Sequence, residues 1–273
     1  MYVPFVFFYP KHQVATIPKH QLSKFLTNSL SKTLTSYYPW AGSLKNNATI
    51  ECDDHGAEFF EVEINSSMNK VVHNPDLTFP QGLCWRYSSS STSGALTVAQ
   101  LSHFECGGIA LSLCLSHKVG DACNTYYFLR DWARLTRDPK IILSPRYFAK
   151  DSLMPSPFDG PMVYQIIEPR REGCIHKRTR KLAFQQRNCD VYHITSTLAF
   201  EFEKIDFGFG KPARASQGSG PSSNTFILMN TPADHDRGVN AFVNLKEQDM
   251  SIFKNDKDLL QFATPVYCSG RIK

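Results

Sequence analysis

The side chains best suited to catalysis in this chain of 273 residues are a histidine and an aspartate spaced four residues apart. His117 and Asp121 lie in the sequence SHKVGD, with Gly120 between them. A neutral imidazole can take a proton from a hydroxyl or an amine near pH 7, and such general-base catalysis is worth about 10²–10⁴-fold in rate. Asp121 could hold the ring, or it could only cap a helix that begins after it. So short a pattern recurs by chance. When this motif is taken alone, we therefore favour a structural role for both residues, with Asp121 as a helix cap.

A glycine-rich segment is the second candidate, and its residues are Asp206, Phe207, Gly208, Phe209 and Gly210. Glycines at alternate positions allow the backbone to take positive φ or to approach another group closely. The spacing matches neither a P-loop nor a dinucleotide-binding turn. A tight structural turn is therefore favoured over a catalytic role for Asp206.

Motifs for other kinds of site are weak or missing. The eight cysteines form no CxxC pair, the histidines show no metal-ligand spacing, and there is no GxSxG elbow, so we expect neither a metal nor a serine nucleophile. The basic run at 177–181 could bind phosphate or nucleic acid, but no recognisable binding motif surrounds it and a solvated linker is favoured. The net charge of +5 is too small to choose between an anionic small ligand and nucleic acid.

The composition indicates a folded protein. Hydrophobic residues make up 42% of the chain, which is enough for a core. No apolar run approaches the roughly 18 residues of a membrane span, and the first residues lack the positive charge of a signal peptide. We therefore expect a cytoplasmic protein with free thiols and no membrane partner.

The elements around His117 can be predicted from the hydrophobic pattern. Residues 95–104 and 109–116 are predicted strands joined by a glycine turn, and the second strand ends directly before His117. A helix is predicted from Asp121 to about residue 137. Its apolar stripe is Phe128, Leu129, Trp132 and Ala133. His117 would then lie between a strand and a helix, where α/β sheets often place functional side chains.

The rest of the chain also alternates between strand and helix patterns. The pieces 49–52 and 57–64 are expected to form a hairpin, and 213–223 is expected to be a Ser/Gly-rich loop. Further strands are predicted at 3–9, 191–207, 225–229 and 238–245, and helices over 22–37 and 247–262. This alternation predicts an α/β or α+β class.

Taken together and in this order, the motifs resemble those of the BAHD acyltransferases of plants. The segment 104–132 resembles the family's segment leading through HxxxD, and 206–212 stands in the place of its DFGWGKP motif. The segments 2–10 and 26–42 resemble the family's first strand and its helix ending in a YP-AG turn, and 224–263 resembles its closing region. The likeness is strongest to the alkaloid and alcohol acetyltransferases of the family.

The resemblance implies a chloramphenicol-acetyltransferase-like fold of mixed sheets with flanking helices, in two similar halves with a channel between them. It implies transfer of an acyl group, acetyl in the first instance, from acyl-CoA to an alcohol or amine of a plant specialised metabolite. His117 inherits the role of general base, with direct attack on the thioester and no acyl-enzyme. Asp121 and the segment 206–210 inherit structural roles, although Asp206 is also a candidate for catalysis. The implied protein is a cytoplasmic monomer without a permanent cofactor.

The chain departs from the family pattern mainly in length. Family members are longer by roughly half or more, and most of their second half has no counterpart here. We therefore divide the chain into an N-terminal half, 1–187, and a remnant of the C-terminal half, 188–273. The missing stretch normally supplies much of the coenzyme A wall and an arginine that pairs with the HxxxD aspartate, so Asp121 is expected to lack its ion-pair partner. The residues that contact coenzyme A stay unknown, and Phe209 replaces the family's tryptophan.

Two other functions stay open on the sequence. A truncated, non-catalytic remnant or binding protein of the same family is indicated by the shortened second half, which would expose apolar surface and strand edges. A nucleic-acid-binding module that uses the basic run at 177–181 ranks last.

Overall fold

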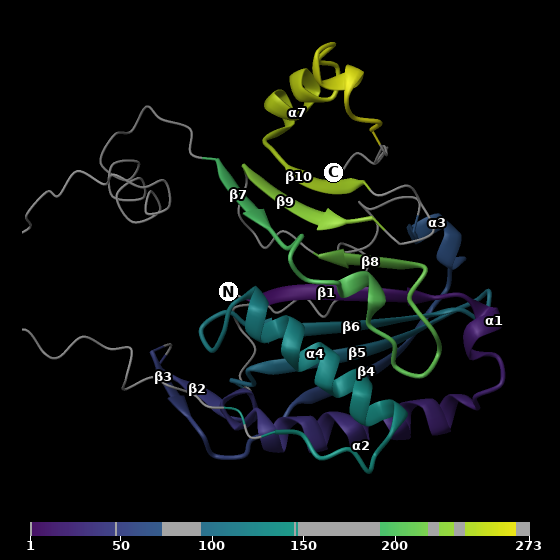
Figure 1. Ribbon diagram of the computed structural model, residues 1–273, viewed down its shortest axis with the longest axis vertical. Coiled ribbons are helices and arrows are strands. Elements are labelled where there is room, and N and C mark those ends of the chain that lie inside the picture. The colour runs from purple at the N-terminus through teal and green to yellow at the C-terminus, as the bar shows by residue number, and fades with distance from the viewer. Residues whose placement is uncertain are drawn as a thin grey trace, which may run out of the picture. The chain divides into compact units, whose positions relative to one another are not determined.

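A computed structural model describes residues 2–46, 48–72, 94–144, 146, 192–217, 224–231 and 238–265 (Figure 1). Residues 1–144 and 193–273 form one compact unit, and this unit contains every element named below. The second unit, 145–192, lies almost wholly outside the described residues, as does the expected boundary between the two halves at 187.

A five-stranded mixed sheet forms the centre of the unit, in the order β4-β5-β6-β1-β8. Its strands are β1 (Tyr2–Tyr9), β4 (Glu58–Ile64), β5 (Thr97–Phe104), β6 (Ile109–Ser116) and β8 (Arg214–Gln217). β4 pairs in parallel with β5, and the other neighbours are antiparallel. Every residue of β5 and β6 is buried, which explains why both strands combine apolar and small side chains on their two faces.

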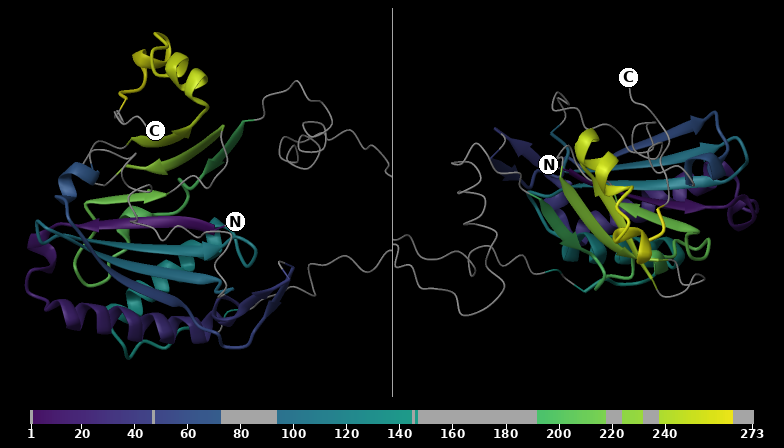
Figure 2. Two further views of the ribbon diagram at one scale, coloured as in Figure 1. Left: turned by 180° about the vertical axis from the view of Figure 1, so that it is seen from behind. Right: turned by 90° about the horizontal axis from the view of Figure 1, so that it is seen from above.

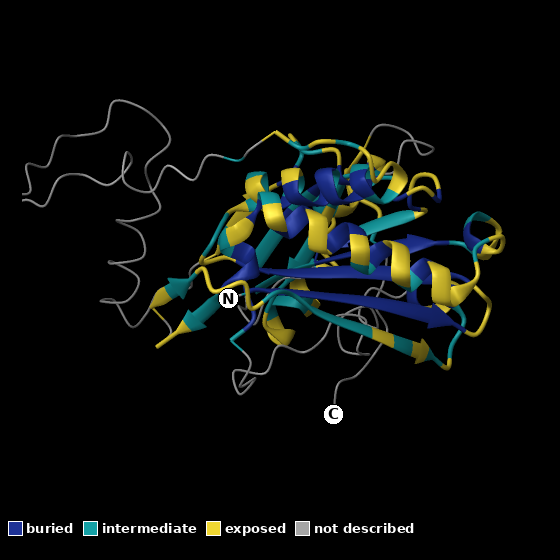
Figure 3. Cartoon of the chain, turned by 90° about the horizontal axis from the view of Figure 1, so that it is seen from below, coloured by how far each residue is buried: buried dark blue, intermediate teal, exposed yellow. Residues whose placement is uncertain are grey.

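Two helices cover one face of this sheet, α2 (Lys19–Ser36) and α4 (Ala122–Arg137) (Figures 1 and 2). The four residues of the expected apolar stripe in α4 are all buried. The indole of Trp132 joins the helices, because its Nε1–H donates to Ser29 Oγ at 3.0 Å and to the Leu26 carbonyl at 3.2 Å. Figure 3 shows the resulting alternation of buried and exposed residues on the helices and the buried strands beside them.

The opposite face of the sheet carries a smaller apolar cluster. It includes Val6 and Phe8 of β1, Val98 and Phe104 of β5, and Met68 and Val71 of the short helix α3 (Met68–Val72) together with Ala110 and Cys114. The sheet is therefore packed on both sides, which makes it the rigid part from which loops extend.

A second, three-stranded sheet follows later in the chain, in the order β10-β9-β7. It consists of β7 (His193–Ser196), β9 (Thr225–Asn230) and β10 (Val239–Asn244), with β7 parallel to β9. The helix α7 (Glu247–Phe253) contributes no buried residue, although Phe253 meets Phe226 with 5.8 Å between ring centroids. Several apolar side chains of this region are exposed: Ile194, Val239, Ile252 and Phe262.

Short elements complete the described part of the chain. They are α1 (Lys11–Val14), η1 (Tyr38–Ala41), β2 (Ser43–Lys45), β3 (Thr49–Glu51), η3 (Phe202–Lys204) and η4 (Leu259–Gln261). The expected hairpin between 49–52 and 57–64 is wrong in its pairing. β3 pairs with β2, whereas β4 joins β5 in parallel, because the apolar side chains of β4 pack at the edge of the large sheet.

Three other predicted segments, a strand, a helix and a loop, differ from the structure in where they begin or end. The strand expected over 191–207 is only β7, and its later part turns into η3. The helix expected over 247–262 ends after Phe253, because the side chain of Asp256 accepts the N–H groups of Asp258 and Leu259 and starts a separate turn. The loop expected over 213–223 contains β8, which pairs with β1.

No helix among the described residues is long and apolar enough to cross a membrane.

Two neighbouring residues of α2 test the packing of the helix layer. Leu26 is fully buried, whereas half of the adjacent Phe25 is exposed. Leu26→Ala should lower the free energy of unfolding by about 2–5 kcal/mol, because it removes apolar contacts and leaves a cavity. Phe25→Ala deletes a larger side chain but should cost only about 1 kcal/mol or less. Urea denaturation of both variants makes the comparison, and a larger loss at Phe25 would contradict this orientation of α2.

Candidate active site in the loop between β6 and α4

His117 is the first residue after β6, on a short loop that leads into α4. The loop begins with a tight turn, since the Val119 N–H donates to the Ser116 carbonyl at 3.1 Å and the Lys118 N–H lies 3.4 Å from Ser116 Oγ. Ser116 is buried, but His117 is exposed. The histidine is therefore presented to solvent from a backbone that the sheet holds in place.

Asp121 is the N-cap of α4 and forms a capping box with Asn124. Asp121 Oδ1 accepts the Asn124 N–H at 3.0 Å, and Asn124 Oδ1 accepts the Asp121 N–H at 3.2 Å. Asp121 is exposed, so its carboxylate needs no arginine partner to offset a cost of burial. The expected absence of that partner stays a prediction. The geometry matches the capping interpretation of this residue, because its side chain and its N–H each form a hydrogen bond with Asn124.

The segment from Asp206 to Gly210 folds into a compact turn around its own aspartate. Asp206 Oδ1 accepts the N–H of Gly208 at 2.7 Å and the N–H of Gly210 at 2.9 Å. Both glycines have positive φ, +103° and +87°, where any other residue is strained. This explains why the turn requires glycine at these two positions.

The two phenylalanines of this turn are buried against the main core. Phe207 meets Trp132 of α4 edge-on at 4.9 Å between ring centroids, and Phe209 meets Tyr9 at the end of β1 edge-on at 5.2 Å. Arg137 donates to the Asp206 carbonyl. Burial raises the pKa of Tyr9 well above its ordinary value, and the negative charge of Asp206 raises it further.

The two motifs lie at opposite ends of the sheet. Ser116, next to His117, pairs with Tyr2, whereas the turn at 206–210 packs on Tyr9 at the other end of β1 (Figure 1). Seven residue steps separate these ends of β1, which is about 23 Å of strand. Asp206 is therefore not brought together with His117 and Asp121, and it cannot exchange a proton with His117 directly.

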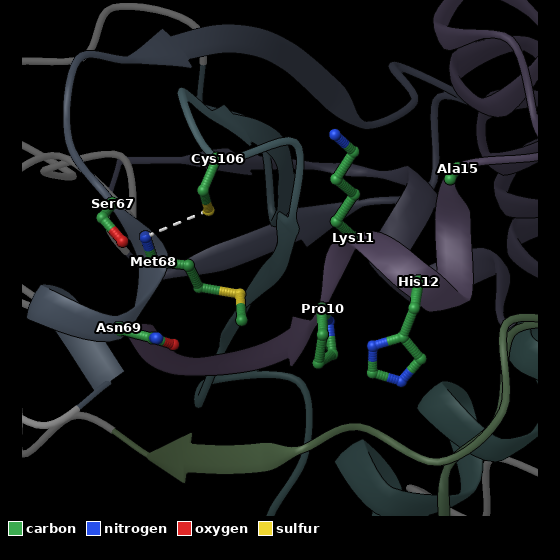
Figure 4. A pocket seen from close by; sticks show the side chains of 8 residues that line it. All are labelled: Pro10, Lys11, His12, Ala15, Ser67, Met68, Asn69 and Cys106. Atoms are coloured by element: carbon green, nitrogen blue, oxygen red, sulfur yellow. Dashed lines mark hydrogen bonds between the residues drawn. The ribbon is translucent and has the colours of Figure 1, made fainter.

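A pocket of about 500 Å³ opens at the Tyr9 end of the sheet (Figure 4). It is lined by Pro10, Lys11, His12, Ala15, Ser67, Met68, Asn69 and Cys106, and it includes no candidate catalytic residue. The Met68 N–H points to Cys106 Sγ at 3.4 Å. Partial burial raises the pKa of the Cys106 thiol, but hydrogen bonds from the Met68 and Gly108 backbone and from Ser67 outweigh burial, and the pKa lies below its ordinary value.

A second pocket of about 230 Å³ lies beside the C-terminal half of α4 and includes Arg130, Arg134, Arg137, Lys204 and Asp206. Its charged groups already pair within the chain, Lys204 with Glu201 and the first two arginines with the buried Asp131. Neither pocket reaches His117. Among the described residues, no group of three His, Cys, Asp or Glu side chains could hold a metal ion.

Sequence reasoning missed the partners that position these motifs. Asn124 gives no standard capping-box signal, because that pattern ends in Glu or Gln. Trp132 was recognised only as part of an apolar stripe, and the contact with Phe207 joins residues 75 positions apart. Cys106 carries no motif, and two of its hydrogen-bond donors, Ser67 and Met68, precede it by nearly forty residues.

Comparison with known proteins gives consistent matches along the chain. A family model described as the Transferase family matches residues 1–187 and 170–260. The acyltransferase Pun1 of Capsicum frutescens is 26% identical, over 96% of this chain and 90% of the relative. The crystal structure of vinorine synthase superimposes with a TM-score of 0.72 at 20% identity, over 92% of this chain and 88% of that one. TRI101 of F. sporotrichioides, complexed with coenzyme A and T-2, gives a TM-score of 0.65 at 12% identity.

The alignment with Pun1 also measures what the chain lacks. It extends over 407 positions, whereas the chain has 273 residues, so at least 134 aligned positions have no counterpart here. The two matches to the family model overlap at residues 170–187 of this chain.

The capping interpretation of Asp121 predicts different outcomes for two substitutions. Asp121→Ala should lower the free energy of unfolding by about 1 kcal/mol, because the Asn124 N–H loses its acceptor. Asp121→Asn keeps an acceptor oxygen in the same place and should cost only a few tenths of that value. Urea denaturation measures both, and equal losses would contradict a capping role.

The hydrogen bonds to Cys106 predict a thiol that ionises at lower pH in the folded chain than in the unfolded one. The rate of alkylation by iodoacetamide at Cys106, followed by peptide mass spectrometry, should therefore reach half its maximum at lower pH in buffer than in urea. Ser67→Ala should move this midpoint upward, because it removes one donor. An equal or higher midpoint in the folded chain would show that burial dominates.

Proposed function

The chain belongs to the BAHD family of acyl-CoA-dependent acyltransferases, and from this premise we propose that it transfers an acyl group from coenzyme A to an alcohol or amine of a small plant metabolite. The observation that carries the proposal is His117, exposed on a turn fixed by the end of β6 and the start of α4. Acetyl is the first acyl group to test, because the motifs of the sequence resemble those of alkaloid and alcohol acetyltransferases.

In the proposed reaction, His117 acts as the general base. Its imidazole takes the proton of the acceptor hydroxyl or amine while the acceptor atom attacks the thioester carbonyl carbon. The tetrahedral intermediate collapses by breaking the carbon–sulfur bond, and the imidazolium returns the proton to the leaving sulfur. The products are an ester or amide and free coenzyme A, and no covalent bond to the protein forms.

Asp121 and Asp206 have structural roles in this proposal. Asp121 orders the start of α4 through Asn124, directly after the loop that carries His117. Asp206 closes the glycine turn that packs on Tyr9 and Trp132, about 23 Å of strand from His117. Gly120, Phe207, Gly208, Phe209 and Gly210 complete the two structural motifs. A cytoplasmic monomer that needs only acyl-CoA and the acceptor completes the proposal.

A second candidate is a non-catalytic remnant that binds a partner. It is favoured by the missing stretch of at least 134 aligned positions and by the exposed Ile194, Val239, Ile252 and Phe262 of the C-terminal region. A shortened second half exposes apolar surface that the missing stretch would otherwise cover. This candidate predicts no coenzyme A binding by the isolated chain.

Titration calorimetry of coenzyme A into the purified chain separates the two candidates. The transferase proposal predicts saturable heat with a stoichiometry near one, because a productive enzyme must hold its acyl donor. The remnant predicts only heat of dilution. A chain with a sharp urea transition that still gives no binding heat would rule out the enzyme as proposed, since poor folding could then not explain the result.

His117→Ala tests the base directly. Release of coenzyme A thiol from acetyl-CoA, measured with a chromogenic disulfide and a panel of alcohols and amines, should fall about 10²–10⁴-fold. His20→Ala is the matched control, because His20 is exposed in the first turn of α2, at the opposite end of that helix from η1, and should leave the rate unchanged. An unaltered rate in His117→Ala would contradict the role of His117 as general base.

A further inference from the structure

We propose that Trp40 is the positioning residue for His117 and that it acts by supporting Gly120 in the loop between β6 and α4. The inference rests on the proposed role of His117. It concerns a residue that lies 77 positions earlier in the sequence, in the short helix η1 that follows α2.

The indole of Trp40 is held firmly by its surroundings. Trp40 lies in η1, just after α2, and only 1% of it is exposed. Its ring centroid lies 5.8 Å from that of Tyr37 and 5.7 Å from that of Phe128 in α4. The Trp40 carbonyl accepts the hydroxyl of Thr97 in β5 at 2.9 Å. Helix, sheet and backbone therefore all fix the ring.

The backbone of the His117 loop lies directly on this ring. A Cβ at Gly120 would stand 2.6 Å from Cζ2 and 2.8 Å from Cη2 of Trp40, which is closer than real Cβ atoms come to their neighbours. It would also stand 2.8 Å from the Cβ of Asn124. Gly120 does not have positive φ, so glycine is required here for space and not for its conformational freedom.

The contact completes the positioning of the loop. One end is held by the Ser116–Val119 turn and the other by the capping box of Asp121 and Asn124. Both of these interactions are local to β6 and α4. Trp40 supplies the contact from outside them, so the indole sets how far the loop, and His117 with it, stands from the rest of the helix layer.

The shape of the indole matters more here than its polar atom. Trp40 Nε1 is buried and has no hydrogen-bond partner among the described residues. The N–H group therefore gains nothing from its position, whereas the six-membered ring of the indole carries the two atoms that meet Gly120. Phenylalanine would remove the unpaired N–H and would leave a gap below the loop.

Because the Trp40 indole and Gly120 fit together, a change in one can be compensated by a change in the other, and the test is a rescue experiment. Gly120→Ala alone should displace the loop, because the new methyl group clashes with the indole. Trp40→Phe alone should leave the loop without support. In the double variant, the methyl group fills the gap left by the indole, and the effect should be smaller than that of Gly120→Ala alone.

The first measurement does not depend on activity. The rate of carbethoxylation of His117 by diethyl pyrocarbonate, followed by peptide mass spectrometry, should change severalfold in each single variant and return toward the original rate in the double variant. His20 in the same molecule is the internal control, because it is exposed at the opposite end of α2 from Trp40, and its rate should stay constant. Equal rates at His117 in all four proteins, or single effects that multiply in the double variant, would overturn the proposal.

The second measurement uses turnover. Gly120→Ala should lower kcat by about 10²-fold, because a displacement of about 1 Å costs this much, and the double variant should recover at least tenfold. KM for acetyl-CoA should change less than kcat. If no protein turns over, the proposed function fails while the modification rates still decide the positioning. If the unsubstituted chain turns over and Gly120→Ala matches it, the positioning fails and the function stands.

Discussion

The position of β1 between β6 and β8 is the constraint on which the rest of the structure depends. β1 pairs with β6 along its whole length and with β8 over four residues, and β8 lies about two hundred residues later in the sequence. Aromatic contacts follow this pairing along one face, where Phe5 stacks on Phe202 at 4.5 Å and Tyr9 meets Phe209 at 5.2 Å. These buried contacts hold the turn at 206–210 and the residues before it against the large sheet. Each contact is worth about 0.5–1.5 kcal/mol beyond the burial of apolar area.

The same sheet keeps the proposed catalytic residue, His117, apart from the structural turn at 206–210. The end of β6 at Tyr2 presents His117, and the far end at Tyr9 carries the turn closed by Asp206. Since strands are rigid and about 23 Å lies between the ends, the two motifs act on the reaction in different ways. In the proposed reaction, His117 acts on the reacting atom, whereas Asp206 acts only through the packing of α4. Trp132 of α4 contacts Phe207, and Phe128, one turn earlier, contacts Trp40, so α4 packs on residues beside both motifs.

The sequence predicted the elements that are defined by their own pattern and missed those defined by distant partners. The strands at 3–9, 95–104 and 109–116 and the helix after Asp121 were predicted closely, since their apolar residues and turn signals are local. β8 was mistaken for a loop, because Arg-Ala-Ser-Gln has no strand pattern and its pairing comes from β1. The position of His117 before α4 followed from the motif, but its support by Trp40 depends on a contact between side chains far apart in sequence.

The exposure of His117 and the length of the chain determine which part of catalysis is most sensitive. A general base supplies about 3–5 kcal/mol of barrier lowering, whereas holding two substrates in the reacting geometry supplies about 7–11 kcal/mol. The resemblance assigns much of the coenzyme A wall to the stretch that has no counterpart here. In the proposed reaction, loss of that wall would therefore cost more rate than loss of the histidine, since positioning is the larger contribution. The affinity of the chain for coenzyme A, more than the presence of His117, decides whether this shortened member of the family works as a transferase.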